Sequence, residues 1–300
     1  AISRGLVGSE MCIRDSILAM NGASAQISKF GAVSEFVGGV SSIHNLKKLR
    51  DSNGKIKMEV LLESFSKLKS FINPDSKIEV VISASNQNFD KETTTKTGLE
   101  NLDVLNGVDL QSEEIAWITG SDVNFCAQAF PTVGYDHPDA PILTVLGAVL
   151  RNGFLHSAIR EKGGAYGSGA QQDSASRSFR FFSYRDPNCM ETFNAFNESI
   201  EWSLKSINSE KLEEGILGVI SSIDKPGSPA GEARADFNQN IRGIDQSKRK
   251  IFRSRVINCS VERLVEVSNK YLTGEPKRSV ISGKHFEKEI KDLGLSIHNV

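Results

Sequence analysis

Hydrophobic residues in the second half of the chain recur with the spacing of a long, deeply buried helix. Its apolar stripe would keep one broad face away from water. The stripe consists of Ile142, Val145, Leu146, Val149, Phe154, Leu155 and Ile159. Gly163 and Gly164 follow it, and a glycine after the last helical turn accepts the left-handed conformation that other residues resist. We therefore predict a helix that ends at a tight glycine corner, with Arg160 and Tyr166 held close together on either side of it.

Strand-like segments flank this helix on both sides. The expected strands are 114–119, 123–130, 165–171 and 178–184, the last with Phe179, Phe181 and Tyr184 alternating imperfectly. Asp186 and Pro187 form a helix-start signal, and Ser209 is expected to cap the next helix. After a loop at 224–231 come two further helices and a short closing strand near 279–282. This order predicts an α+β fold, a two-layer sandwich whose mainly antiparallel sheet is covered by helices on one face.

The first third of the chain reads as a separate unit. Residues 55–72 place Met58, Leu61, Leu62, Phe65, Leu68 and Ile72 on one helical face, and residues 77–83 alternate as a strand. Residues 86–112 are polar and lose periodicity, which is typical of a linker. We therefore divide the chain into the C-terminal part of a truncated α+β domain at 17–85, a linker at 86–112 and a complete C-terminal α+β domain at 113–300.

Residues 1–16 have neither a signal-peptide pattern nor an amphipathic period. They resemble a translated adapter sequence, so we expect this segment to be non-native and exclude it from the fold prediction. An independent read of the same locus with those codons in frame would contradict this hypothesis.

Composition narrows the possible functions. The formal net charge of the 300 residues is −1, which does not favour a nucleic-acid or membrane partner. The basic run 248–255 suggests phosphate contact, but Ile251 and Phe252 interrupt it, so we expect the solvated face of an amphipathic helix. Cys126 and Cys189 are expected to be small core residues and free thiols. No continuous apolar run approaches the length that spans a bilayer.

Three segments carry a family resemblance: LRNGFLHSAIREKGGAYGSGA from residue 150, FFSYRDPN from residue 181 and SSIDKPGSP from residue 221. Together they resemble the C-terminal half of the presequence-protease branch of the pitrilysin-like family, the inverted zinc metallopeptidases. The similarity extends from about residue 17 to 283. It implies a fold of the mitochondrial-processing-peptidase-like or LuxS-like metallohydrolase type. It also implies an enzyme that closes around unfolded peptides and degrades presequences and other short peptides.

The zinc-binding motif of that family, H-x-x-E-H, belongs to the N-terminal half. None of His44, His137, His156, His285 or His298 lies in such a motif. We therefore expect no metal on this chain, with zinc bound by an N-terminal half of the same polypeptide, and we expect this chain alone to be inactive. The implied partners are unfolded peptides and that N-terminal half, with no nucleic acid and no membrane. The implied location is the mitochondrial matrix or plastid stroma in a eukaryote, or a soluble bacterial compartment.

The resemblance assigns catalytic support to Arg160 and Tyr166 and substrate binding to Gly163, Gly164 and Gly167. Tyr166 would donate to the scissile carbonyl, Arg160 would hold backbone carbonyls with its planar donors, and the glycines would let an extended peptide lie against the main chain. From the residues alone, an arginine at a helix end often meets the last carbonyls, and a tyrosine that opens a strand is often a core residue. His156 is expected to be a packed or capping histidine rather than a ligand. A catalytically silent scaffold subunit of the same fold is the alternative function, and a phosphate or nucleic-acid binder is a remote third.

Overall fold

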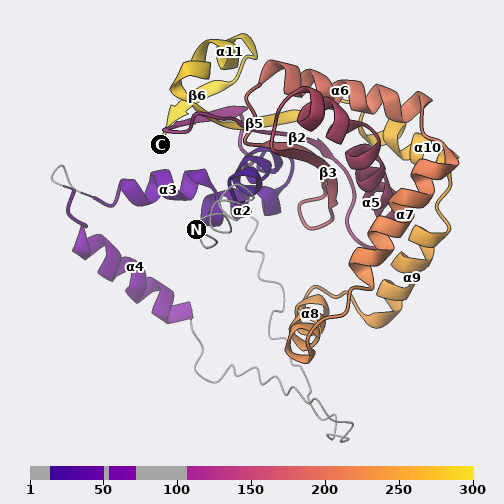
Figure 1. Cartoon of the computed structure of the whole chain (residues 1–300). Coiled ribbons are helices and arrows are strands. Elements are labelled where there is room, and N and C mark those ends of the chain that lie inside the picture. Colours follow the sequence, from indigo (N-terminus) through magenta and orange to yellow (C-terminus); the bar gives the residue numbers. More distant parts are fainter. Residues whose placement is uncertain (1–13, 51–53, 72–106) are drawn as a thin grey trace, which may run out of the picture.

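A single six-stranded sheet, in the order β3-β4-β2-β5-β1-β6, organises the computed structural model, which describes residues 14–50, 54–71 and 107–300 (Figure 1). The strands are β1 (Ile115–Thr119), β2 (Phe125–Pro131), β3 (Gly167–Asp173), β4 (Ser178–Tyr184), β5 (Lys277–Gly283) and β6 (Ser296–Asn299). Neighbours from β3 to β5 pair antiparallel, whereas β1 pairs parallel with both β5 and β6. The predicted mainly antiparallel sheet packed against helices is confirmed.

Helices cover one face of this sheet around the long central helix (Figure 1). The helices of this layer are α5 (Asp139–Leu150), η1 (Arg151–Lys162), α6 (Met190–Lys205), α7 (Ser209–Ile223), α9 (Gln246–Ile257) and α10 (Val261–Tyr271). By length and composition the helix Asp139–Lys162 is apolar enough to cross a membrane, although no apolar run of that length was predicted from the sequence. Half of its apolar window is buried inside the protein.

Side chains of the strands alternate between two cores, because successive residues of a strand point to opposite faces. Phe179 and Phe181 on β4 enter the core beneath the helices, together with Cys126 and Phe130 of β2. Tyr184 belongs to the other face, with Phe182. Tyr184 is three and five positions away from Phe181 and Phe179, and these odd steps put it on the opposite face, which is where the predicted alternation is imperfect.

The second face is covered by a helix that includes residues 14–24. Ala19, Met20 and Ala23 of this helix are buried against Trp117 of β1 and Ala127 of β2. The proposed domain boundaries place residues 17–85 in a unit of their own, yet this part of it packs directly on the sheet of 113–300. The helix includes residues 14–16, which are the last residues of the expected adapter segment 1–16. Residues 1–13 of that segment lie outside the described part.

Three further helices follow, α2 (Lys29–Gly38), α3 (Val40–Lys47) and α4 (Met58–Phe71). The predicted helix at 55–72 is present as α4, which stands away from the sheet (Figure 1). Its apolar stripe is not buried, because Met58, Leu62, Phe65 and Leu68 are all exposed. The predicted strand at 77–83 and most of the linker at 86–112 lie outside the described residues.

Local signals misplaced two helix starts. Asp186 does not cap α6, which begins at Met190 after Cys189, and the cap of α7 is Asn208 rather than Ser209. The remaining helices are α8 (Pro229–Ile241), the short η2 (Lys284–Phe286) and α11 (Glu287–Asp292). Two helices were predicted between the loop at 224–231 and the closing strand, but three are present, α8, α9 and α10. The helices η2 and α11 and the strand β6 were not predicted. They follow the closing strand in segments too short for a clear hydrophobic period.

Candidate functional site

The predicted glycine corner joins η1 to the edge strand β3. The amide of Gly163 donates to the carbonyl of Ala158 five residues earlier (3.1 Å), which is the hydrogen bond of a π-helix. The amide of Ala165 then donates to the carbonyl of Ile159 (3.1 Å), and Gly164 takes the left-handed conformation with φ +78°. The chain thus reverses within three residues, as the double glycine predicted.

The helix before this corner changes from α to π at Arg151. Its apolar stripe contains the reason, because the step from Leu150 to Leu155, both fully buried, is five residues instead of three or four. His156 and Glu161 face each other at the same spacing, with 3.5 Å between Nδ1 and Oε1. The five-residue step, also present between Val149 and Phe154, is a sequence signal from which the π-helix could have been predicted. The π-helical hydrogen-bond pattern is rare, and its commonest form, a single-turn π-bulge within an α-helix, is frequently found at functional sites.

Arg160 and Tyr166 lie together on the outside of the corner. The guanidinium carbon of Arg160 is 6.0 Å from the centre of the Tyr166 ring, a separation at which a cation and an aromatic face attract. Both side chains are exposed, Tyr166 by 54%. The corner thus presents a cation and a phenol hydroxyl to solvent, next to a strand edge.

An aromatic row that the sequence analysis missed continues from Tyr166 across the sheet. The ring centres of Tyr166 and Tyr184 are 5.8 Å apart, and Tyr184 stacks on Phe182 at 6.4 Å. Gly167 and Gly169 of β3 make room for this row, because a Cβ at Gly167 would overlap the ring of Tyr184 and one at Gly169 would press on Phe182. The alternation of Phe182 and Tyr184 along β4 is the signal that could have found the row.

Two polar residues, the half-buried Asn188 and the buried Asp186, hold the corner from behind. The side-chain amide of Asn188 donates to the carbonyl of Gly163 (2.6 Å), and the backbone amide of Asn188 donates to Asp186 Oδ1 (3.0 Å). Burial raises the pKa of Asp186, although hydrogen bonds to its carboxylate oppose the rise. Tyr166 itself donates its amide to the carbonyl of Arg185 (3.3 Å), a residue with φ +49°. Asp186, predicted as a helix cap, instead anchors the loop that supports the corner.

The three glycines proposed for substrate binding differ in their surroundings. Gly164 is exposed, Gly163 is half-buried and Gly167 is buried. A Cβ at Gly163 would press on the carbonyl of Ile159, and one at Gly167 on Tyr184. Two of the three glycines therefore have an internal packing reason, independent of any peptide.

Metal binding does not fit the described part of the chain. No group of three or more His, Cys, Asp or Glu side chains comes together there in a way that could hold a metal ion. Of the histidines, His44 and His298 pack their rings against Trp117, at 5.8 and 5.4 Å.

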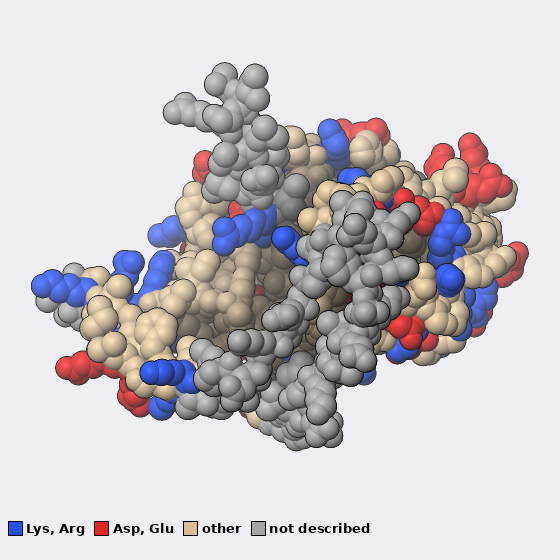
Figure 2. All heavy atoms as spheres, turned by 90° about the horizontal axis from the view of Figure 1, so that it is seen from below, with Lys and Arg blue, Asp and Glu red and all other residues tan. Residues whose placement is uncertain are grey.

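The basic run 248–255 forms part of α9, and acidic neighbours meet several of its charges. Lys248 contacts Asp136 at 3.0 Å, Arg249 contacts Asp236 at 2.6 Å, and Arg253 contacts Asp224 at 2.6 Å. Figure 2 likewise shows acidic and basic side chains interspersed on the face it presents. The interpretation as a solvated helix face accounts for this run without a phosphate ligand.

The corner has the chemistry of a carbonyl-binding site. A phenol hydroxyl is a good hydrogen-bond donor, and a guanidinium offers several donors in a fixed plane. Among the described strands β3 lies at the end of the sheet and pairs only with β4, so the backbone groups on its outer edge are not bonded to another described strand; a free strand edge is where an extended peptide can add. Together these features suit the backbone of an extended peptide.

Comparison with known proteins places the corner inside a family domain. Residues 120–279 match the family model described as PreP C-terminal domain. The mitochondrial presequence protease of Danio rerio is 35% identical over 152 residues, which are 50% of this chain and 14% of that protein. The presequence protease of Drosophila melanogaster is 30% identical over 258 residues, or 83% of this chain and 24% of that protein.

A solved structure supports the fold alone. A protease from Helicobacter pylori superposes with a TM-score of 0.50 and 17% identity, over 56% of this chain and 43% of that one.

This chain spans about a quarter or less of the two presequence proteases above, and more than half of it matches the family model. The chain belongs to the PreP C-terminal domain family.

Proposed function

We propose that this chain is the substrate-binding part of a zinc metalloendopeptidase that degrades presequences and other short unfolded peptides. The observation that carries the proposal is the exposed pair of Arg160 and Tyr166, 6.0 Å apart beside the free edge of β3. The hydroxyl of Tyr166 donates a hydrogen bond to the scissile carbonyl oxygen as negative charge develops there. Arg160 holds neighbouring backbone carbonyls, and Gly163, Gly164 and Gly167 let the peptide approach the main chain.

The zinc would be held by another part of the longer polypeptide. The described residues offer no place for it, so the steps proposed for this chain are limited to binding and orienting the peptide. On this proposal the chain alone is inactive, and it acts only when the N-terminal half of the same polypeptide closes over it. The relatives named above are mitochondrial, which supports a location in the mitochondrial matrix.

The test removes the Tyr166 hydroxyl in the full-length polypeptide. Loss of one donor that stabilises developing charge costs on the order of 3 kcal/mol, so Tyr166→Phe should lower kcat for an unfolded peptide roughly 100-fold and leave KM nearly unchanged. Tyr135→Phe is the matched control, because Tyr135 stacks on Phe252 at 4.7 Å, away from the corner. This variant should hydrolyse the peptide like wild type. Equal kcat in wild type and Tyr166→Phe would contradict the proposed role.

The same assay distinguishes the proposed enzyme from the alternative function, a catalytically silent scaffold subunit. A silent scaffold has no chemical need for both Arg160 and Tyr166, and full-length wild type would then hydrolyse no peptide. Hydrolysis that depends on both residues, with Arg160→Lys also impaired because lysine lacks the planar fork, supports the enzyme.

A further inference from the structure

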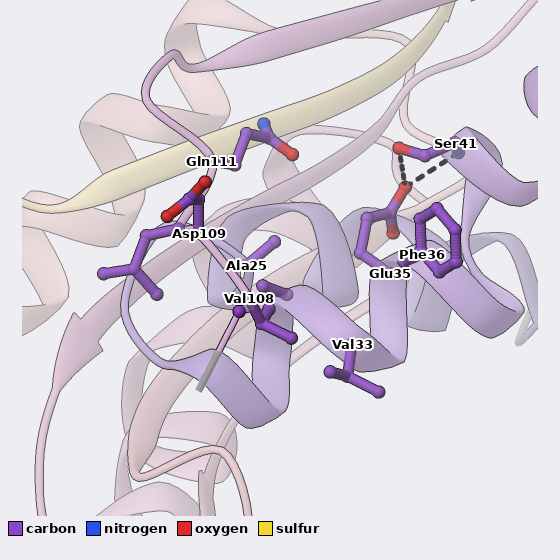
Figure 3. Close-up of a pocket in the computed structure, with 11 residues that line it drawn as sticks. Ala25, Val33, Glu35, Phe36, Ser41, Val108, Asp109 and Gln111 are labelled. Atoms are coloured by element: carbon purple, nitrogen blue, oxygen red, sulfur yellow. Dashed lines mark hydrogen bonds between the residues drawn. The ribbon is translucent and has the colours of Figure 1, made fainter. Parts of the chain in front are cut away.

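The buried carboxylates of Glu35 and Asp186 take no part in the chemistry proposed for the corner. Glu35 lines a pocket of about 460 Å³ between α2, the start of α3 and the segment that leads into β1 (Figure 3). Its Oε1 accepts hydrogen bonds from the amide and the hydroxyl of Ser41, both at 2.9 Å (Figure 3). These bonds lie in the first turn of α3, so Glu35 serves the start of that helix. Asp186 lies beside the corner, where its task is different.

The loop between β4 and α6 contacts the glycine corner on both sides of Gly164, the residue in the left-handed conformation. Before Gly164, the side-chain amide of Asn188 donates to the carbonyl of Gly163 (2.6 Å). After it, the amide of Tyr166 donates to the carbonyl of Arg185 (3.3 Å). The loop therefore restrains both the end of η1 and the start of β3, with the freely turning glycine between them.

This loop is anchored in the body of the domain. Asp186 is fully buried, and its carboxylate accepts hydrogen bonds from the amide of Asn188 (3.0 Å) and from the hydroxyl of Thr192 on α6 (2.7 Å). The backbone of Asp186 also exchanges two hydrogen bonds with that of Asn124, next to β2, at 2.8 and 2.9 Å. The side chain of Asn188 thus reaches the corner from a base that is tied to both α6 and the sheet.

Arg185 indicates that the loop is held against a backbone preference. Its φ of +49° lies in the left-handed region, which residues other than glycine seldom adopt. Such residues persist where the surroundings hold them, and they cluster at active sites. The side chain of Arg185 is exposed, so its packing does not require this conformation. What the conformation provides is the carbonyl that meets the amide of Tyr166.

We propose that Asn188 is a positioning residue for the reaction. Through the carbonyl of Gly163 it fixes the end of η1, and with it the placement of Arg160 and Tyr166 relative to each other, at 6.0 Å. The inference rests on the proposed function, because it takes these two side chains to act on a peptide. Without this bond the corner is less restrained, and the hydroxyl of Tyr166 spends less time where the peptide carbonyl develops charge. A misplacement of about 1 Å can lower a rate as much as 100-fold.

Hydrolysis of an unfolded peptide by the full-length polypeptide tests the proposal. Asn188→Ala removes the donor, and Asn188→Leu removes it while keeping a side chain of similar size. Both should lower kcat about tenfold and leave KM within about twofold of wild type, because binding remains and only the placement of Tyr166 suffers. The matched control is Asn258→Ala, which loses an amide donated to the carbonyl of Ser254 at the end of α9 (2.8 Å). It should keep the wild-type kcat.

A double variant shows through which residue Asn188 acts. In a Tyr166→Phe background, Asn188→Ala should lower kcat by at most about threefold, since the hydroxyl that it positions is already absent. Circular dichroism shows whether each variant has folded, and Asn188→Leu decides the matter if Asn188→Ala does not fold.

Wild-type kcat in a folded Asn188 variant would overturn the proposal. So would a tenfold loss that recurs in full in the Tyr166→Phe background, because Asn188 would then act independently of the tyrosine hydroxyl. Failure of the proposed function has a different signature, which is wild-type kcat in Tyr166→Phe alone. The two failures are therefore distinguishable.

Discussion

Each glycine near the corner meets a different physical constraint. Gly164 has φ +78° and little around it, so its constraint is conformational. Gly167 has an ordinary strand conformation, and its constraint is the ring of Tyr184. Sequence alone shows the same residue type at both positions, although only the first would be explained by a turn.

Gly164→Ala should destabilise the protein by about 1 kcal/mol, because an L-residue pays a steric cost in the left-handed region. Gly218→Ala is the matched control, since Gly218 lies inside α7 with open space around it and should gain up to about 1 kcal/mol from the higher helix propensity of alanine. Urea unfolding measures both. Changes of the same sign in the two variants would show that the conformation of Gly164 is not the source of the effect.

At the scale of elements, Asp139 joins the start of α5 to α10. Its carboxylate is 5% exposed and accepts hydrogen bonds from Arg263 (2.7 Å), Lys270 (2.9 Å) and Tyr271 (2.7 Å). Burial alone would raise the pKa of Asp139, but the hydrogen bonds from Lys270 and Tyr271 outweigh burial and hold the pKa below the ordinary value of 3.8. The ionised carboxylate therefore stabilises the folded state.

Asp139→Asn should lower the free energy of unfolding by about 2 kcal/mol at pH 7, because charged hydrogen bonds become neutral ones. A carboxyl whose folded pKa is lowered contributes stability above its unfolded pKa and loses it as the pH falls through the folded value. The difference from wild type should therefore be constant at neutral pH and shrink below about pH 3.8. Urea midpoints at several pH values measure it, and a difference that grows on acidification would contradict the assignment. Asp224→Asn, at an exposed ion pair with Arg253, should change stability far less.

For the whole molecule, the sheet is a two-sided structure. The helix 14–24 closes the face that carries Trp117, Phe125 and Ile281, while the long helix closes the other. Beyond this helix, α4 exposes Met58, Leu62, Phe65 and Leu68, an apolar stripe that the described residues do not cover. Burial of the second face thus depends on the helix 14–24, which is separated from the strands by many residues along the sequence.

Ala23→Glu should undock the helix 14–24 and cost at least about 3 kcal/mol, because Ala23 is fully buried and a charge there has no partner. With Trp202 replaced by phenylalanine, Trp117 is the remaining tryptophan of the chain, and its emission should shift to the red as that face becomes wet. Ile17→Glu, on the exposed side of the same helix, should leave both stability and emission near wild type. An unchanged emission maximum in Ala23→Glu would contradict the assigned packing.

Hydrophobic periodicity was sufficient for elements whose buried face is set locally. The stripe from Ile142 to Ile159 predicted the central helix, and Gly163 with Gly164 predicted its end. Periodicity failed where packing decides, since the stripe of α4 from Met58 to Leu68 is helical but exposed. The helix-start signal failed at Asp186, whose carboxylate accepts a hydrogen bond from the amide of Asn188 and supports the corner instead of capping α6.

The sequence by itself determined the order of the main elements, the glycine corner and the proximity of Arg160 to Tyr166, because these depend on spacing along a short stretch of chain. Only the tertiary structure decided that the helix 14–24 covers the second face, that Phe182 and Tyr184 extend the aromatic row, and that Asn188 reaches the glycine corner. Each of these arises from contacts between segments far apart in sequence, and no local spacing encodes which distant residues will meet.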